Sequence, residues 1–277
     1  MRSLRCLKIL ERILGKKLWL NQLVFEVTRR CNMFCDHCLR DEAENIDMAK
    51  EIIDKTLANV RGIKNLTFTG GEPTLAVELI RYIYEVCVRN NITVNHVWCA
   101  TNGKEMSLDF LDVMTKFIEY TTEYYDGDEY YGVALSTDQF HEMLDEENYD
   151  FYRNYEYYDD CKDNLSKGKK LNYTIPEGRA DINYLPTNDY NHILTDCSFD
   201  GSISEELNEV DIEDGMIYVN ALGEILLNCD YSFYTQEEKT QGNILKEDNL
   251  IYQVIARHAS EDSFEEVDEE EGELAYV

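Results

Sequence analysis

Short apolar runs alternate with stretches of helical periodicity through the first half of the chain. Runs typical of strands lie at residues 23–28, 66–69, 94–100 and 132–136. The intervening helices are expected at 49–60 with Asp47 as N-cap and Gly62 as terminator, around Leu75–Val86, and from a Ser107 cap through Phe117. Strands that alternate with helices of this length predict βα units, a parallel sheet and right-handed crossovers.

The regular alternation weakens after about residue 140. A helix is expected over 141–158, a strand over 171–175, and an antiparallel hairpin from 216–219 and 225–227. This change of architecture predicts a small C-terminal appendage. The expected division is 1–20 (N-terminal amphipathic helix), 21–189 (core), 190–260 (appendage) and 261–277 (acidic tail).

The N-terminal segment is a basic amphipathic helix, with leucines and isoleucines on one face and Arg and Lys elsewhere. Such a helix can lie on a membrane surface. A helix packed against the body of the domain is the alternative that this pattern favours.

Charge excludes some classes of function. The 277 residues contain 26 Lys and Arg against 56 Asp and Glu, which gives a formal charge of −30 and an isoelectric point near 4.4. Binding along a nucleic-acid backbone is excluded because it needs basic side chains.

A mean hydropathy of −0.47 without a long uncharged apolar run argues against a membrane span. Nine cysteines without a secretory signal indicate reduced thiols in a cytoplasmic protein.

Three of the cysteines, Cys31, Cys35 and Cys38, have CxxxCxxC spacing directly after the first expected strand. A loop at this place lies at the carboxyl end of a parallel sheet, where active sites form. Two metal centres fit three clustered thiolates. Zinc needs a fourth ligand, such as His37 or a distant thiol, whereas a [4Fe–4S] cluster held by three cysteines leaves one iron open. The spacing of the three cysteines favours an iron–sulfur cluster over a zinc ion.

A second motif, Gly70-Gly71-Glu72-Pro73, ends the second strand. Together with CxxxCxxC, it resembles the radical S-adenosylmethionine (radical SAM) superfamily over residues 23–180. The resemblance implies an α/β fold, a partial (β/α)6 TIM-like barrel with the C-terminal hairpin appended. It also implies that the three cysteines hold a [4Fe–4S] cluster whose fourth iron binds S-adenosylmethionine, that His37 lies against adenine, and that Gly70–Pro73 support the methionine amino group, with Glu72 as a negative charge.

Later strand ends match the family more weakly. Asn102 is expected as a polar contact of the cofactor, Ser136 and Asp138 as ribose contacts, and Arg179 as the partner of a cofactor or substrate carboxylate. Each has a simpler alternative: a turn for Asn102, a helix cap for Ser136 or Asp138, and a surface salt bridge for Arg179. His141 is expected to be structural, with proton donation as the alternative.

The C-terminal part, with Cys197, the hairpin and Cys229, resembles the SPASM or twitch extensions of peptide-modifying radical SAM enzymes. The spacing between Gly223 and Cys229 departs by one residue, and the later cysteine-rich run is missing. An auxiliary iron–sulfur cluster would need Cys161 or an open iron, and a metal-free remnant is the favoured interpretation.

The resemblance implies reductive cleavage of S-adenosylmethionine to a 5′-deoxyadenosyl radical, which removes hydrogen from a peptide or small-molecule substrate. The expected electron donor is of flavodoxin or ferredoxin type, and the basic N-terminal helix or Lys162, Lys167, Lys169 and Lys170 would form its docking patch. Three alternatives stay open: a Cys3His zinc module without catalysis, an activase of a partner protein, and a barrel that binds the cofactor without chemistry.

Overall fold

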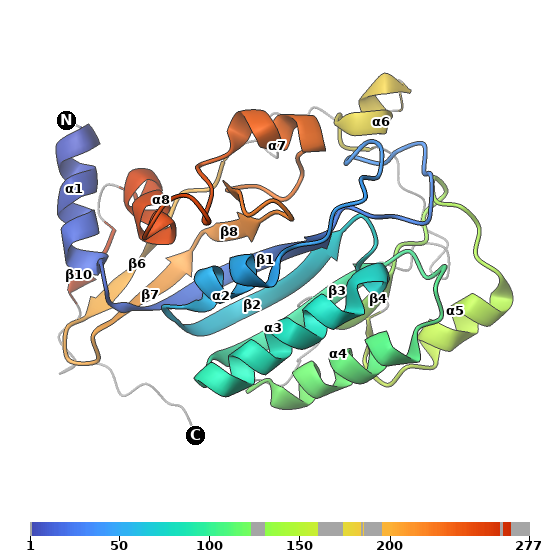
Figure 1. The fold of residues 1–277 in the computed structure, drawn as a ribbon, viewed down its shortest axis with the longest axis horizontal. Helices are drawn as coiled ribbons and strands as arrows, with labels where there is room; N and C mark the ends of the chain where they lie inside the picture. Colours follow the sequence, from blue (N-terminus) through green and yellow to red (C-terminus); the bar gives the residue numbers. More distant parts are fainter. Residues whose placement is uncertain are drawn as a thin grey trace.

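The computed structural model describes residues 2–122, 131–159, 174–183, 185, 196–260 and 263–266. The described strands form one open, mostly parallel sheet in the order β10-β6-β7-β1-β2-β3-β4-β5, with β8 also paired to β1 and β9 to β8 (Figure 1). The strands are β1 Lys17–Thr28, β2 Val60–Gly70, β3 Thr93–Thr101, β4 Gly132–Leu135, β5 Tyr158–Asp159, β6 Asp200–Ser204, β7 Glu209–Asp214, β8 Met216–Val219, β9 Ile225–Leu226 and β10 Glu265–Glu266.

Helices connect successive parallel strands in the first half of the chain. Figure 1 shows α2, α3 and α4 together on one face of β1 to β4, while α7 and α6 lie near the end of the sheet where β1 finishes. The helices are α1 Arg2–Ile13, α2 Lys50–Leu57, a 3₁₀ turn η1 Pro73–Ala76, α3 Val77–Asn90, α4 Leu108–Tyr120, α5 Glu146–Arg153, α6 Gly178–Ile182, α7 Phe233–Lys239 and α8 Leu250–His258.

The two faces of the central strands differ in chemistry. Leu23 and Phe25 of β1 and Phe68 of β2 are fully buried in the main apolar core, beneath the helices. Gln22, Thr67 and the neighbouring His96 of β3 are half-buried and line a cavity on the other face. This arrangement confirms the expected α/β partial barrel: an apolar layer holds the helices, and a polar concave surface remains inside.

The C-terminal hairpin joins this sheet directly. β8 pairs parallel with Gln22–Phe25 of β1 and antiparallel with β9, as the sequence predicts for a hairpin at these positions. β7 pairs with the beginning of β1 at Lys17–Trp19. β1 therefore has β2 along one edge and C-terminal strands along the other.

Several local predictions were wrong. Ala49 rather than Asp47 occupies the N-cap of α2, because the Asp47 carboxylate accepts hydrogen bonds from Thr28 Oγ1 (2.6 Å) and Arg30 Nε (2.8 Å). Gly62 lies inside β2 rather than ending that helix. The helix expected over 141–158 is confined to α5, and most of the strand expected over 171–175 lies outside the described residues.

A buried carboxylate fixes β1 to the C-terminal elements. Glu26 is fully buried, and its oxygens accept hydrogen bonds from Arg29 Nε (2.9 Å), Tyr218 Oη (2.6 Å), Gln236 Nε2 (2.9 Å) and the amide of Ala221 (3.2 Å). A buried charge needs such partners to offset its lost hydration. Glu26 thus holds β8, the turn after it and α7 at the carboxyl end of β1.

Helix α1 lies at the other end of β1. Its Ile9 and Ile13 are buried, and the helix packs against α8, as the packed alternative predicts. Leu4, Leu7 and Leu14 are exposed. Within the described residues, no helix has the length and apolar character needed to span a bilayer.

We expect Glu26→Ala to lower the free energy of unfolding by about 3–5 kcal/mol, because it leaves the Arg29 guanidinium buried beside an empty site. Lys116→Ala, which removes an exposed pair with Asp112, should leave the free energy of unfolding nearly unchanged. Urea denaturation of the two variants measures the difference, and equal midpoints would contradict the assignment.

Candidate functional site

The three motif cysteines lie in the loop that follows β1. Cys31, Cys35 and Cys38 line one small cavity of about 40 Å³ together with Gly70 and Gly71 from the end of β2. Arg179 of α6 and Phe233 of α7 complete its wall. The fold therefore brings together two motifs that are more than thirty residues apart in the sequence, as expected from neighbouring parallel strands.

Both glycines allow a close backbone approach. A Cβ at Gly71 would lie 2.3 Å from the carbonyl oxygen of Arg30, and one at Gly70 2.2 Å from that of Thr28. The Gly71 amide donates to Thr28 O (2.8 Å), and the Glu72 amide donates to Arg30 O (2.7 Å). The glycines thus let the end of β2 lie directly against the backbone that enters the cysteine loop.

Glu72 organises the strand ends instead of facing the cavity. Its carboxylate is almost fully buried and accepts hydrogen bonds from Thr74 Oγ1 (2.7 Å), Thr101 Oγ1 (2.7 Å) and the Asn102 amide (2.8 Å). Burial raises the pKa of this carboxyl group, and the hydrogen bonds oppose that shift. The role expected from the sequence, a negative charge for an ammonium group, stays a prediction; in the structure Glu72 links β2 to β3 and caps η1.

Asn102 connects the end of β3 to the cysteine loop. Its side-chain amide donates to Asn32 Oδ1 (2.8 Å) and lies 3.8 Å from Cys31 Sγ. The turn that the Asn-Gly sequence predicts is also present, with Gly103 at a φ of 72°. The two interpretations of Asn102, a turn residue and a polar neighbour of the centre, are therefore compatible.

Arg179 is buried rather than part of a surface salt bridge. Its Nε donates to Cys35 O (2.8 Å), its amide donates to Cys38 O (2.9 Å), and its guanidinium lies 3.9 Å from the centre of the Phe34 ring. Among the described residues, its Nη1 has no hydrogen-bond partner although it is buried. A buried cation with a vacant donor beside three cysteines is suited to an anionic group.

His37 lies close to the end of β4. Its Nε2 is 3.7 Å from Asp138 Oδ2, and its ring is 4.5 Å from the ring of His141. Burial and the neighbouring His141 lower the pKa of His37 to about 4, so its imidazole is neutral near pH 7. Ser136 directly follows β4 and is half-buried.

The sequence indicated His141 only as a structural residue and gave no indication of Arg40. His141 contacts both His37 and Asp138, and its position three residues after Asp138 was the available signal for these contacts. Arg40, fully buried, donates to the carbonyl oxygens of Cys229 (2.7 Å) and Tyr231, which ties the cysteine loop to the C-terminal part. The sequence contained no signal for the contacts of Arg40, because its partners are backbone atoms about 190 residues away.

The three thiols do not converge as closely as one other group of side chains. Among the described residues, His37, Asp138 and His141 form the one group of three potential ligand atoms that lie within 4.8 Å of one another. At least one pair of the three thiols is therefore more than 4.8 Å apart. A single zinc ion with Zn–S bonds of about 2.3 Å would require thiolates roughly 3.8 Å apart, so zinc binding would require the loop to contract.

A larger cavity opens beside the cysteine loop. It has a volume of about 640 Å³, and Arg40 lines both cavities. Its wall follows the concave face of β1, β2 and β3. Most of its polar lining is neutral: Asn21, Gln22, Asn65, Thr67, Thr69, His96 and Trp98.

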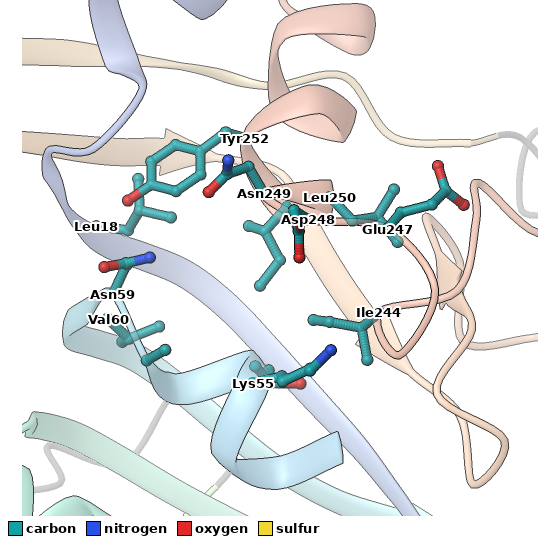
Figure 2. A pocket seen from close by; sticks show the side chains of 13 residues that line it. Leu18, Lys55, Asn59, Val60, Ile244, Glu247, Asp248, Asn249, Leu250 and Tyr252 are labelled. Carbon is teal, nitrogen blue, oxygen red and sulfur yellow. The ribbon is translucent and has the colours of Figure 1, made fainter. Parts of the chain in front are cut away.

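A third cavity, of about 170 Å³, lies at the opposite end of the sheet (Figure 2). Leu18 of β1, Lys55 of α2 and Tyr252 of α8 are among its lining residues. It contains no residue of the two motifs. Glu247 and Asp248 lie on its rim with Lys55, so it offers no single sign of charge to a ligand.

Neither of the C-terminal cysteines Cys197 and Cys229 lines the cavity of the three motif cysteines. Cys197 Sγ accepts a hydrogen bond from the Met216 amide (3.2 Å), and Cys229 is half-buried beside Asp230. Cys161, the third expected ligand of an auxiliary cluster, lies outside the described residues. The auxiliary cluster and the metal-free remnant both stay predictions.

Comparisons with known proteins agree with these motifs. Residues 25–159 match the Radical SAM superfamily. An uncharacterized protein of Methanocaldococcus jannaschii is 39% identical over 80 residues, 27% of this chain and 28% of that protein, and a GTP 3′,8-cyclase of Clostridium botulinum is 33% identical over 109 residues, 35% and 34% of the two chains. The matches thus span about a third or less of these relatives.

A solved structure described as native anSMEcpe with bound AdoMet and a Cp18Cys peptide resembles the whole fold. Its TM-score is 0.50 at 13% sequence identity, and the alignment covers 87% of this chain and 82% of that one. The likeness supports the open, partial barrel.

We expect Gly71→Ala to reduce metal loading, because the new Cβ displaces Arg30 O at the entrance of the cysteine loop. Gly201→Ala is a matched control: its Cβ would lie 2.0 Å from Asp211 O, far along the chain between β6 and β7. Both variants should be destabilised, but iron content per folded chain should fall only for Gly71→Ala. Equal iron content would argue against this role of the glycine.

Metal retention should also depend on pH. Burial raises the pKa of the Cys35 thiol to about 11 and also raises that of Cys31. These thiols therefore carry protons in the metal-free chain at neutral pH, and metal binding must release them. Iron affinity should increase between pH 6.5 and 8.5 by about tenfold per pH unit for each proton released. Competition with a chelator at several pH values measures this slope, and a flat profile would contradict it.

Proposed function

This chain belongs to the radical SAM superfamily through residues 25–159, and from that membership we propose that it is an enzyme that reductively cleaves S-adenosylmethionine. The observation that carries the proposal is the shared cavity of Cys31, Cys35 and Cys38 with Gly70, Gly71 and Arg179. A bound [4Fe–4S] cluster would supply one electron to the sulfonium, and the 5′-deoxyadenosyl radical so formed would remove hydrogen from the substrate.

The donor set fits this cofactor pair. Three free thiols provide three ligands and would leave the fourth iron of a [4Fe–4S] cluster open. In our proposal the unpartnered Nη1 of Arg179 binds a carboxylate in this cavity, and backbone carbonyls near Gly70 and Gly71 accept from the amino group. Glu72 then acts through position: it fixes the strand ends that carry these carbonyls.

The adenosine would lie toward the end of β4. We propose that His37 lies against the adenine and that Asp138 and Ser136 accept hydrogen bonds from the ribose. Asn102, bonded to Asn32, would hold the cysteine loop against β3. The neutral imidazole of His37 suits a contact with a flat aromatic base, because it brings no buried charge.

The neutral, polar cavity of about 640 Å³ is our proposed substrate site. Its side-chain amides both donate and accept hydrogen bonds, which matches the peptide groups of a peptide or a similar small molecule. Arg40, the one Arg or Lys among its lining residues in the described chain, already donates to backbone carbonyls. A triphosphate such as the GTP named in one relative is therefore a poor match.

The electron donor must approach the cysteine loop. Helix α1 precedes β1 and the loop follows it, so a strand of 12 residues, about 40 Å at roughly 3.3 Å per residue, separates them. Docking on the basic N-terminal helix would leave the donor too distant. The alternative patch of Lys162, Lys167, Lys169 and Lys170 lies outside the described residues. We place a flavodoxin or ferredoxin type of donor at the face around Phe34, which is 62% exposed in the loop itself. Such cluster chemistry favours the reducing cytoplasm.

Three other functions are less well supported. A Cys3His zinc module would require the three thiols to move closer together, because at least one pair of them is more than 4.8 Å apart. The C-terminal strands that extend the sheet exceed what an activase of a partner protein needs. Only product analysis distinguishes the proposed enzyme from a barrel that binds S-adenosylmethionine without cleaving it.

The decisive experiment is anaerobic purification followed by cofactor analysis. We expect iron and sulfide near four each per chain, broad visible absorbance, and 5′-deoxyadenosine on addition of dithionite and S-adenosylmethionine. Cys35→Ala should abolish cluster and product. Cys87→Ala, a buried cysteine of α3, should retain both.

A colourless protein with one zinc per chain would instead establish the zinc module. A loaded cluster without 5′-deoxyadenosine would refute the enzyme.

A further inference from the structure

Three potential metal ligands converge beside the cysteine loop without being part of its thiol set. They are His37 in the loop, and Asp138 and His141 after β4. Their ligand atoms all lie within 4.8 Å of one another. The side chains of the two histidines are 16% exposed and that of Asp138 is 9% exposed, so the cluster is largely shielded from water.

The distances match a tetrahedral ion. With bonds of about 2.0–2.2 Å from zinc to nitrogen or oxygen, neighbouring ligand atoms lie roughly 3.3–3.5 Å apart. His141 Nδ1 is 3.0 Å from Asp138 Oδ1, and His37 Nε2 is 3.7 Å from Asp138 Oδ2. The two observed distances lie on either side of the ideal value, so small side-chain rotations suffice to bind an ion.

The hydrogen-bonding state of the histidines points the same way. His141 Nδ1 is buried 3.0 Å from Asp138 Oδ1 in a geometry that is poor for a hydrogen bond, and His37 Nδ1 is buried without a partner. A buried ring nitrogen without a partner is costly. A metal ion between His141 Nδ1 and Asp138 would replace their poorly aligned contact, and the free nitrogen of His37 would remain for a water molecule or a second hydrogen bond.

The charges around the cluster are mixed. Asp138 contributes one negative charge, while the Arg179 guanidinium acts on His37 from the other side and opposes a cation. Two imidazoles and a carboxylate with one open position are nevertheless a typical zinc ligand set. The net balance predicts moderate affinity rather than a permanent structural ion.

We propose that His37, Asp138 and His141 bind a zinc ion. The site is distinct from the three thiols because all its ligand atoms are nitrogen or oxygen. Where the proposed function also holds, zinc and S-adenosylmethionine exclude each other, since His37 and Asp138 are the residues proposed for the adenosine. Zinc would then act as a competitive inhibitor that leaves the cluster intact.

Cobalt(II) tests the binding directly, since its tetrahedral complexes absorb visible light. The full-length chain with Cys31, Cys35 and Cys38 changed to Ser should bind one Co²⁺, with absorbance at 500–650 nm that zinc abolishes. In this background His141→Ala and Asp138→Asn should each weaken binding at least about 100-fold, in line with the loss of a ligand. His258→Ala, a histidine of α8 that bonds Gln241, should not change it.

Unchanged affinity in His141→Ala and Asp138→Asn would overturn the site, as would a thiolate-to-cobalt absorption band showing that other cysteines bind the ion. These readouts need no cluster, so they remain valid if the proposed enzyme activity fails. In the cluster-loaded native protein, zinc should raise the apparent Kd for S-adenosylmethionine in equilibrium dialysis. Unaltered cofactor binding at saturating zinc would refute the exclusion.

Discussion

The ion pair between Glu26 and Arg29 is the interaction on which the carboxyl end of the sheet depends. Both side chains are buried, at the point where β1 passes into the cysteine loop. Arg29 also donates to Glu44 (2.8 Å) later in that loop and to Gln236 Oε1 (2.9 Å) in α7, and its guanidinium packs 4.2 Å from the Phe233 ring. One charge pair thus orients the loop backbone, and breaking it would leave an uncompensated ion in the interior.

A second buried carboxylate, that of Glu72, connects neighbouring elements in the same way at the end of β2. Glu72 joins β2 to β3 as Glu26 joins β1 to the C-terminal strands. Neither of these two carboxylates is among the residues that line the cysteine cavity, so both serve geometry. Three cations line it, Arg29, Arg40 and Arg179, against one carboxylate, Asp41. The site is therefore positive where an anionic cofactor group would bind, although the protein as a whole carries a formal charge of −30.

Patterns of neighbouring residues predicted the helices, strands and turns that depend on short-range interactions. The alternation of apolar runs and helical stretches gave β1 to β4 and α2 to α4, and Ser107 caps α4 as expected through a bond from the Phe110 amide. The hairpin at β8 and β9 was likewise readable from its turn. The cysteine and glycine motifs meet because parallel strand ends meet.

Contacts between distant residues could not be read in this way. The parallel pairing of β8 with β1 joins segments nearly 200 residues apart, and nothing in either sequence records the register. Asp47 has the residue type of a helix cap, yet tertiary bonds from Thr28 and Arg30 claim its carboxylate. The same holds for Glu72. Its motif indicates a functional site, but only the structure shows that its carboxylate oxygens accept hydrogen bonds from Thr101 and Asn102.

The bonds of Arg40 to the backbone at Cys229 and Tyr231 have a consequence for biogenesis. During translation the cysteine loop leaves the ribosome long before these carbonyls exist. Until β8, β9 and α7 are synthesised, the loop lacks the carbonyl groups to which Arg40 is bonded, so its final shape depends on residues that follow it by about 190 positions.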